Sequence, residues 1–170
     1  GMGKTHLLNA IGLEVGNSKK VMFISSERFM YHFVKSIKNN EMVKFKDFFR
    51  KANIFIIDDI QFLGGKEATQ EEFFHTFNEL MEKGSQVVIS SDRPPSNLDR
   101  IQPRIRSRLS GGLVIDIQPP DLELRIKILK SKFEEIKRNF SENYELNDEV
   151  LKFLASEITS SIREMVGALN

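Results

Sequence analysis

The chain has 170 residues, 40% of them hydrophobic, which is enough for one full domain with a sizeable core, or for one domain with a small addition. Its 25 Lys and Arg residues balance 24 Asp and Glu residues, so net charge favours no polyanionic partner and any nucleic-acid role would depend on local patches. The lack of cysteine excludes disulfide scaffolds and Cys-ligated zinc and fits a cytoplasmic protein, and no apolar run approaches the roughly 20 residues of a membrane span.

Apolar residues alternate along the chain between helical spacing and short continuous runs. Helical spacing is found, in chain order, at 5–15, 27–37, 43–52 and 71–84. Continuous runs, which are typical of strands buried on both faces, are found at 21–25, 53–59, 86–92 and 113–117. This alternation predicts an α/β fold, in which a parallel sheet of four strands is flanked by helices.

Two prolines at 119 and 120 mark a change of pattern, and Asp121 after them can cap a new helix. Only helical patterns follow, at 122–140, 147–159 and 161–170. We therefore predict a nucleotide-binding α/β core at 1–119 and a small helical lid at 120–170.

The first residues, GMGKT, match the end of a nucleotide-binding P-loop, whose pattern is G, four residues, G-K-[ST]. Gly3, Lys4 and Thr5 supply the end of the motif, Gly1 and Met2 supply two variable positions, and the leading glycine would precede residue 1. In such a loop, backbone N–H groups hold the phosphates, Lys4 reaches the β and γ phosphates and the Thr5 hydroxyl binds Mg²⁺. The same letters also occur at ordinary helix starts, so the motif needs a second signal.

The second signal is IFIIDD at 54–59, an apolar run that ends in two acidic residues. This is the Walker B pattern, in which Asp58 holds Mg²⁺ directly or through water and Asp59 orients the attacking water. The alternative is a pair of acids that only cap a strand. Polar residues also end the run at 86–92, so Ser90, Ser91 and Asp92 would emerge near the γ-phosphate, unless they form an ordinary strand end.

An arginine-rich segment, RIQPRIRSRLSGG at 100–112, precedes the fourth run. Such a segment is usually a solvated face, but Ile105 and Leu109 lie between its arginines and would fix some of them in direction. An arginine held in this way could reach the nucleotide of a neighbouring subunit, where it would stabilise the charge of the transferring phosphoryl group.

These motifs occur in an order that resembles one family across nearly the whole chain. The segments are GKTHLL, SERF, IDDIQFL, EEFFHTFNEL, SSDRPP, RIRSRL, QPPDLELR and REMVGALN. In this order they resemble the ATPase domain of the DnaA family, the bacterial chromosomal replication initiators. The resemblance implies a P-loop AAA+ core, with a parallel sheet flanked by helices, followed by a small helical lid.

The resemblance also implies roles for individual residues, beginning with Walker A at Lys4 and Thr5, Walker B at Asp58 and Asp59, and sensor 1 at Asp92. Nucleotide binding is assigned to Gly1, Gly3, Lys4, Thr5 and the sensor 2 residue Arg163. Magnesium is assigned to Thr5 and Asp58, catalysis to Asp59, Asp92 and the arginine finger Arg108, and subunit contact to Arg104 and Arg108.

Single-stranded DNA binding is implied for the helical segment at 27–51, where initiators carry an extra helix. Val34 matches a position implicated in that binding, and Lys35, Lys38, Lys44 and Lys46 could neutralise phosphates, although a solvated face is the alternative. Lys66 is a further candidate, but Ala68 replaces a residue that is often basic in relatives, which puts this contact in doubt. Leu109 replaces the aromatic residue more usual after the finger, a change that affects packing more than charge.

We therefore expect an ATP-binding initiator module that uses ATP or ADP with Mg²⁺, assembles head to tail on ATP, engages and melts origin DNA, and hydrolyses ATP slowly as a regulatory switch. The alternative is a regulatory AAA+ paralogue or helicase-loader adaptor that acts through protein contacts. The resemblance further implies that this chain is a fragment, and that duplex DNA and the replicative helicase bind regions outside it. Acidic phospholipids are a further partner class that the resemblance suggests.

Overall fold

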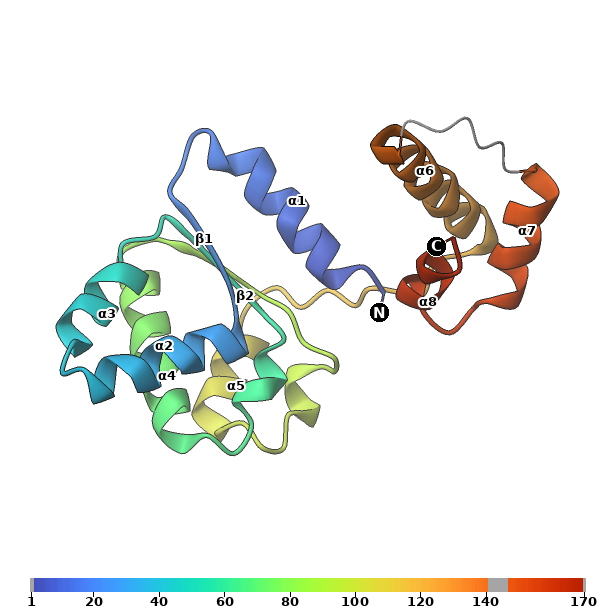
Figure 1. Ribbon diagram of the computed structural model, residues 1–170. Coiled ribbons are helices and arrows are strands. Elements are labelled where there is room, and N and C mark those ends of the chain that lie inside the picture. Colours follow the sequence, from blue (N-terminus) through green and yellow to red (C-terminus); the bar gives the residue numbers. More distant parts are fainter. Residues whose placement is uncertain (1, 141–146, 170) are drawn as a thin grey trace. The chain divides into compact units, whose positions relative to one another are not determined.

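The computed structural model describes residues 2–140 and 147–169; predictions for Gly1 and Asn170 lie outside the described residues. Two compact units are distinguished (Figure 1). One comprises Thr5–Asp116, and the other comprises the residues up to Lys4 together with those from Ile117 onward. We keep the predicted boundary between residues 119 and 120 as a proposal for the functional domains.

The larger unit contains a parallel sheet of three strands in the order β1, β2, β3. The strands are β1 (Val21–Ser25), β2 (Ile54–Asp58) and β3 (Gln86–Ile89). The central strand β2 is buried along its whole length, as its continuous apolar run predicts. Ser25 is in register with Asp58, and Ile57 with Ile89, so the polar residues that end each strand meet at one edge of the sheet.

The predicted fourth strand at 113–117 is wrong for this structure, because the segment has no strand assignment and the described sheet has three strands. Leu113 is 89% exposed and Ile115 is 73% exposed. A strand is stable only where a neighbouring strand pairs with its backbone N–H and C=O groups. Neither edge strand of the described sheet, β1 or β3, pairs with this segment.

Helices cover both faces of the sheet (Figure 1). They are α1 (Lys4–Gly16), α2 (Ser26–Lys38), α3 (Met42–Phe49), η1 (Ile60–Leu63), α4 (Glu67–Glu82), η2 (Pro95–Asn97) and α5 (Pro103–Ser110). Alternate side chains of a strand point to opposite faces. Ile54 and Ile56 therefore pack with Leu8 of α1, whereas Phe55 and Ile57 join a larger core formed with the other helices.

Phenylalanine dominates the larger core. Phe29 of α2 is completely buried and makes edge-to-face contacts, with ring centroids 5.4 Å from Phe45, 5.1 Å from Phe49 and 6.0 Å from Phe73. Such pairs add about 0.5–1.5 kcal/mol each to the effect of burial alone. They hold α2 and α3 against α4.

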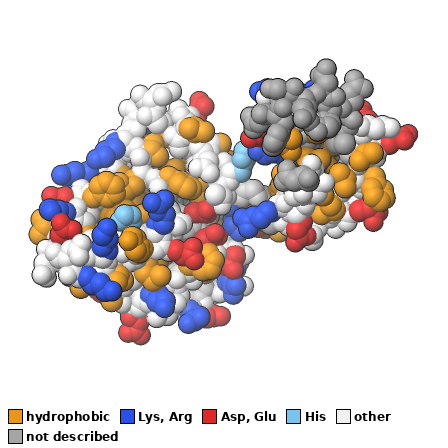
Figure 2. Space-filling model, in the orientation of Figure 1, with side chains coloured by type: hydrophobic (Ala, Val, Ile, Leu, Met, Phe, Trp, Pro, Cys, Tyr) orange, Lys and Arg blue, Asp and Glu red, His pale blue; other side chains and the backbone are white. Residues whose placement is uncertain are grey.

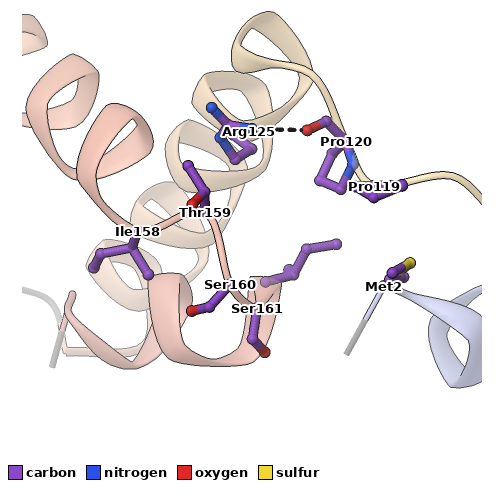
Figure 3. Close-up of a pocket in the computed structure, with 9 residues that line it drawn as sticks. Met2, Pro119, Pro120, Arg125, Ile158, Thr159, Ser160 and Ser161 are labelled. Carbon is purple, nitrogen blue, oxygen red and sulfur yellow. Dashed lines mark hydrogen bonds between the residues drawn. The ribbon is translucent and has the colours of Figure 1, made fainter.

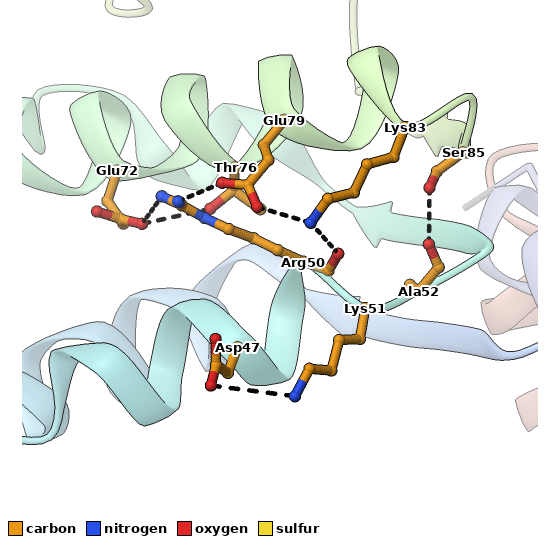
Figure 4. A network of polar contacts seen from close by, with 9 residues as sticks. All are labelled: Asp47, Arg50, Lys51, Ala52, Glu72, Thr76, Glu79, Lys83 and Ser85. Atoms are coloured by element: carbon orange, nitrogen blue, oxygen red, sulfur yellow. Dashed lines mark hydrogen bonds and ion pairs between the residues drawn. The ribbon is translucent and has the colours of Figure 1, made fainter.

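Arg50 at the end of α3 joins that helix to α4 through ion pairs with two glutamates (Figure 4). Its guanidinium contacts Glu72 at 2.9 Å and also contacts Glu79. Lys83 donates to Glu79 at 2.7 Å and to the Arg50 carbonyl at 3.4 Å. The hydrogen bond from Lys83, followed by the charge of Arg50, holds the pKa of Glu79 below its ordinary value of 4.5.

Acid should therefore weaken this part of the fold. Because the pKa of Glu79 is lower in the folded state, its stabilisation is present above pH 4.5 and is lost as the pH falls through the folded value. We expect Glu79→Gln to lower the free energy of unfolding at pH 7 by up to about 1 kcal/mol, as for partly exposed ion pairs. The variant should also lose less stability than the wild type between pH 6 and pH 3.

Urea unfolding across that pH range measures the effect. Glu82→Gln, which changes an exposed glutamate on the same helix, is the matched control. An equal acid sensitivity of the Glu79→Gln variant and the wild type would contradict the prediction.

The smaller unit has its own core beneath three helices, α6 (Leu122–Phe140), α7 (Asp148–Glu157) and α8 (Ile162–Gly167). The core residues are Leu129, Leu151, Ala155 and Met165. Asp121 caps α6 as predicted, because its carboxylate accepts the Leu124 N–H at 2.8 Å. Within the described part of the chain, no helix has both the length and the apolarity needed to cross a bilayer.

Candidate nucleotide-binding site

The structure brings Thr5 and Asp58 into direct contact although they are 53 residues apart. Thr5 lies in the first turn of α1, and Asp58 is the last residue of β2. The Thr5 hydroxyl donates to Asp58 Oδ2 at 2.6 Å. The two oxygens predicted to bind magnesium, one from Walker A and one from Walker B, are therefore neighbours.

Two serines hold Asp58 in place. Ser90, which follows β3, donates its hydroxyl to Asp58 Oδ1, and Ser26 donates to the Asp58 carbonyl at 3.0 Å. Asp58 is only 6% exposed, so these partners and Thr5 compensate for the loss of water around its carboxylate. The sequence places Ser90 near this site, but nothing in the sequence pattern singles out Ser26.

Asp59 turns sharply away from the strand in the left-handed backbone region, with φ 57° and ψ 58°. Aspartate is one of the few residues besides glycine that adopt this conformation readily. Its N–H donates to Ser90 Oγ at 2.9 Å, and its carboxylate accepts from the Gln61 side chain at 3.0 Å. Asp58 and Asp59 thus point in different directions, although they are adjacent in the chain.

Asp92 lies just beyond β3, close to these residues. Its N–H donates to Gln61 Oε1 at 3.3 Å, and its carboxylate accepts two hydrogen bonds from Arg93, at 2.9 and 2.8 Å. These hydrogen bonds raise the pKa of Arg93 above its ordinary value. The predicted sensor residue therefore reaches the Walker B segment through Gln61, a residue that the sequence pattern did not identify.

The end of the P-loop packs against α8 within the smaller unit. Gly3 has φ +88°, which favours glycine, and a Cβ atom added there would lie 3.9 Å from Ile162 Cδ1. Arg163, the predicted sensor 2 residue, follows Ile162 directly and is exposed on α8. Gly3 and the start of α8 are therefore neighbours in space.

A pocket opens beside this contact (Figure 3). It is lined by Met2, Pro119, Pro120, Arg125 and residues 158–162. Arg125 is fixed by hydrogen bonds to the carbonyls of Pro120, at 2.8 Å, and Ala155, at 2.7 Å. The pocket thus lies between the P-loop end and the helices of the smaller unit, with a fixed arginine in its wall.

The two predicted interface arginines are both exposed on α5 but have different surroundings. Ile105 between them is buried in the core and fixes the helix, as predicted from the sequence. Arg104 forms an ion pair with Glu71 and lies over the Phe74 ring, 4.7 Å from its centroid. Arg108 lies in the last turn of α5 and is exposed.

The predicted DNA-binding residues lie on the outer side of α2. Val34, Lys35 and Lys38 are all exposed, and Val34 is flanked by the exposed Tyr31 and Ile37. On the face of the larger unit seen in Figure 2, lysine and arginine side chains are mixed with hydrophobic side chains and with some acidic ones. Such a mixture suits a nucleic-acid strand, because cations contact phosphates and apolar groups contact bases.

Lys66 is also exposed, at the N-terminal end of α4. It is therefore a further exposed candidate for DNA contact, in a different element from Val34, Lys35 and Lys38.

Comparison with known proteins identifies the family. The model of the bacterial DnaA ATPase domain matches residues 1–116. The chromosomal replication initiator protein DnaA of Rickettsia massiliae is 50% identical over the whole chain, which spans 36% of that protein.

Solved structures agree with this assignment. Domain III of the Thermotoga maritima replication initiation protein DnaA is 42% identical and superposes with a TM-score of 0.91, over 99% of this chain and 70% of that one. A replication initiator DnaA bound to AMPPCP and single-stranded DNA is 36% identical, with a TM-score of 0.85 over 99% of this chain and 51% of that one. These neighbours confirm the predicted P-loop AAA+ fold class, and the chain belongs to the bacterial DnaA ATPase domain family.

Proposed function

We propose that this chain is the ATP-binding module of a replication initiator, which assembles head to tail when ATP is bound and then engages and melts origin DNA. The observation that carries the proposal is the direct contact of Thr5 with Asp58, which joins the P-loop to the Walker B strand. Support also comes from the DnaA relative that binds AMPPCP and single-stranded DNA.

In this proposal, the P-loop holds the nucleotide phosphates. Lys4 contacts the β and γ phosphates, Arg163 contributes to nucleotide binding, and backbone N–H groups at the start of α1 bind phosphate oxygens. Thr5 and Asp58 would hold Mg²⁺, since a hydroxyl and a carboxylate oxygen 2.6 Å apart are the hard oxygen donors that this ion prefers. When bound, the ion neutralises phosphate charge.

ATP hydrolysis is proposed to be slow and regulatory. Asp59 accepts a hydrogen bond from the attacking water, and Asp92 lies next to it through Gln61. In trans, Arg108 of one subunit stabilises the developing phosphoryl charge in its neighbour, and Arg104 supports the contact. ATP then joins subunits as well as being a substrate.

Single-stranded DNA is proposed to follow α2, with Val34 against bases and Lys35 and Lys38 against phosphates. We expect Lys35→Glu combined with Lys38→Glu to weaken binding and to flatten its salt dependence. Each lost phosphate contact should lower the slope of log K against log salt by roughly 0.7.

Fluorescence anisotropy with a labelled oligonucleotide, titrated at several salt concentrations with ATP or ADP, measures this effect. Lys19→Glu combined with Lys20→Glu is the matched control, because those lysines are equally exposed but lie before β1. If the slope is unaltered in the Lys35 and Lys38 variant, these lysines do not contact DNA phosphates and the exposed side of α2 is only a solvated surface.

A regulatory paralogue or helicase-loader adaptor is the second candidate. It would bind nucleotide but act through protein contacts. ATP turnover and ATP-dependent DNA melting by the full-length protein are therefore expected for the initiator and not for this second candidate. We further propose a cytoplasmic location, duplex DNA and helicase contacts through regions outside this chain, and acidic phospholipids as an additional partner class.

A further inference from the structure

Gln61 occupies a fixed position between the ends of β2 and β3. It lies in η1, the short helix that follows β2. Its neighbours Ile60 and Leu63 in that helix are completely buried in the core. The Ile60 N–H also donates to the Ser90 carbonyl at 3.0 Å, so the backbone before Gln61 is attached to the end of β3. The Gln61 side chain therefore starts from a rigid base.

Both ends of the Gln61 amide are used, and each contacts a different candidate catalytic acid. Nε2 donates to Asp59 Oδ1 at 3.0 Å, and Oε1 accepts the Asp92 N–H at 3.3 Å. The orientation of the amide follows from its partners, because a carboxylate only accepts and a backbone N–H only donates. No other neutral side chain of this length offers a donor and an acceptor in this arrangement.

The carboxylate of Asp59 has a defined orientation only if a hydrogen-bond partner such as Gln61 restricts its rotation. Its left-handed backbone turns the side chain away from Asp58, and its carboxylate is only partly buried. The terminal rotation of an aspartate side chain is broad unless a hydrogen bond restricts it. The contact with Gln61 supplies that restriction at Oδ1.

We infer that Gln61 is a positioning residue for ATP hydrolysis, whose amide holds the Asp59 carboxylate in the orientation that aligns the attacking water and links it to the backbone of Asp92. The inference rests on the proposed function, in which Asp59 contacts that water. In the step concerned, the water oxygen bonds to the γ-phosphorus while the bond to the bridging oxygen breaks. ADP leaves with that electron pair, and the proton of the water passes to the phosphate product.

Two substitutions test this role by single-turnover hydrolysis of ATP bound to the full-length protein. Gln61→Met removes both hydrogen bonds, and Gln61→Glu replaces the donor with a charge that repels Asp59. We expect each to slow hydrolysis by roughly 10- to 100-fold, since a misplacement of about 1 Å in a reacting group can cost 100-fold. ATP affinity, measured by equilibrium titration, should stay within about threefold. Gln86→Glu, an exposed glutamine at the start of β3, is the matched control.

A pH profile separates positioning from a merely structural role. In the Gln61→Glu variant, the introduced carboxyl regains a donor when protonated, and its proximity to the Asp59 carboxylate favours protonation. The hydrolysis rate of this variant relative to wild type should therefore rise several-fold between pH 8 and pH 5.5, whereas that of Gln61→Met should stay constant. The charged groups near this position are Asp59, Asp92 and Arg93. The wild type contains them too, so dividing the rate of each variant by the wild-type rate at the same pH removes the effect of their titration.

Asp59→Asn distinguishes failure of this inference from failure of the proposed function. If Asp59→Asn hydrolyses ATP at the wild-type rate, the proposed role of Asp59 is wrong. If Asp59→Asn is slow but both Gln61 variants match the wild type, Gln61 does not position Asp59. If Gln61→Met loses affinity and thermal stability together with activity, and Gln61→Glu shows no recovery in acid, the role is structural and the inference is overturned. The combined Asp59→Asn and Gln61→Met variant should be no slower than Asp59→Asn alone.

Discussion

Lys4→Ala is expected to weaken ATP binding by roughly 100-fold or more, because loss of one partner from a hydrogen-bonded charge pair costs about 2–5 kcal/mol. Lys4 is the cation that the P-loop pattern places on the β and γ phosphates. Thr5 and Asp58 remain in the variant and keep their direct contact, so the fold of the strand edge should be retained.

Equilibrium titration of the full-length protein with a fluorescent ATP analogue measures the change. Lys19→Ala, which alters an exposed lysine beyond the other end of α1, should bind as the wild type does. Lys4→Arg tests whether charge alone is sufficient for ATP binding, because a guanidinium keeps the positive charge but lacks the compact geometry of an ammonium group. Wild-type affinity in Lys4→Ala would show that this chain does not use its GKT segment as a P-loop.

Arg108→Ala is expected to abolish ATP-dependent assembly while the isolated subunit still binds ATP within a few-fold of the wild type. An arginine finger acting in trans is worth about 10³ to 10⁵ in rate where it has been measured. Its removal deprives the neighbouring site of a charge but leaves Lys4, Thr5 and Asp58 in the subunit's own site. A finger that acted in cis would instead impair the isolated subunit.

Light scattering and origin-melting assays with ATP measure assembly, and Arg138→Ala is the control because it removes an exposed arginine from α6. A mixing experiment identifies the trans arrangement. Lys4→Ala subunits carry an intact Arg108, so adding them to Arg108→Ala subunits should complete the site of an ATP-bound neighbour and partly restore assembly. If no mixture assembles better than Arg108→Ala alone, the trans assignment is wrong.

The cis contacts of Arg104 affect the interpretation of this experiment. Glu71 and the Phe74 ring hold Arg104 on its own subunit, so its substitution would disturb α4 and α5 as well as any interface. Arg108 is therefore the better residue with which to test assembly.

Local sequence patterns were sufficient to identify most of the helices and strands of this protein and its family. Continuous apolar runs identified the three strands, because a strand buried on both faces has no polar side. Helical spacing and capping residues such as Asp121 identified the helices of the smaller unit, because those signals lie within one or two turns. The order of the motifs identified the family, and the position of the acidic pair Asp58 and Asp59 follows directly from the apolar run that precedes it.

The tertiary structure decided what depends on residues distant in the chain. The segment at 113–117 has the same apolar character as the true strands, but strand formation requires a partner, and sequence alone does not show that this partner is lacking in the described sheet. The left-handed turn at Asp59 and the bridge from Gln61 to Asp92 likewise have no local signature. A glutamine after two aspartates has no periodicity or motif of its own, and only the parallel alignment of β2 with β3 brings the two acids within reach of one amide.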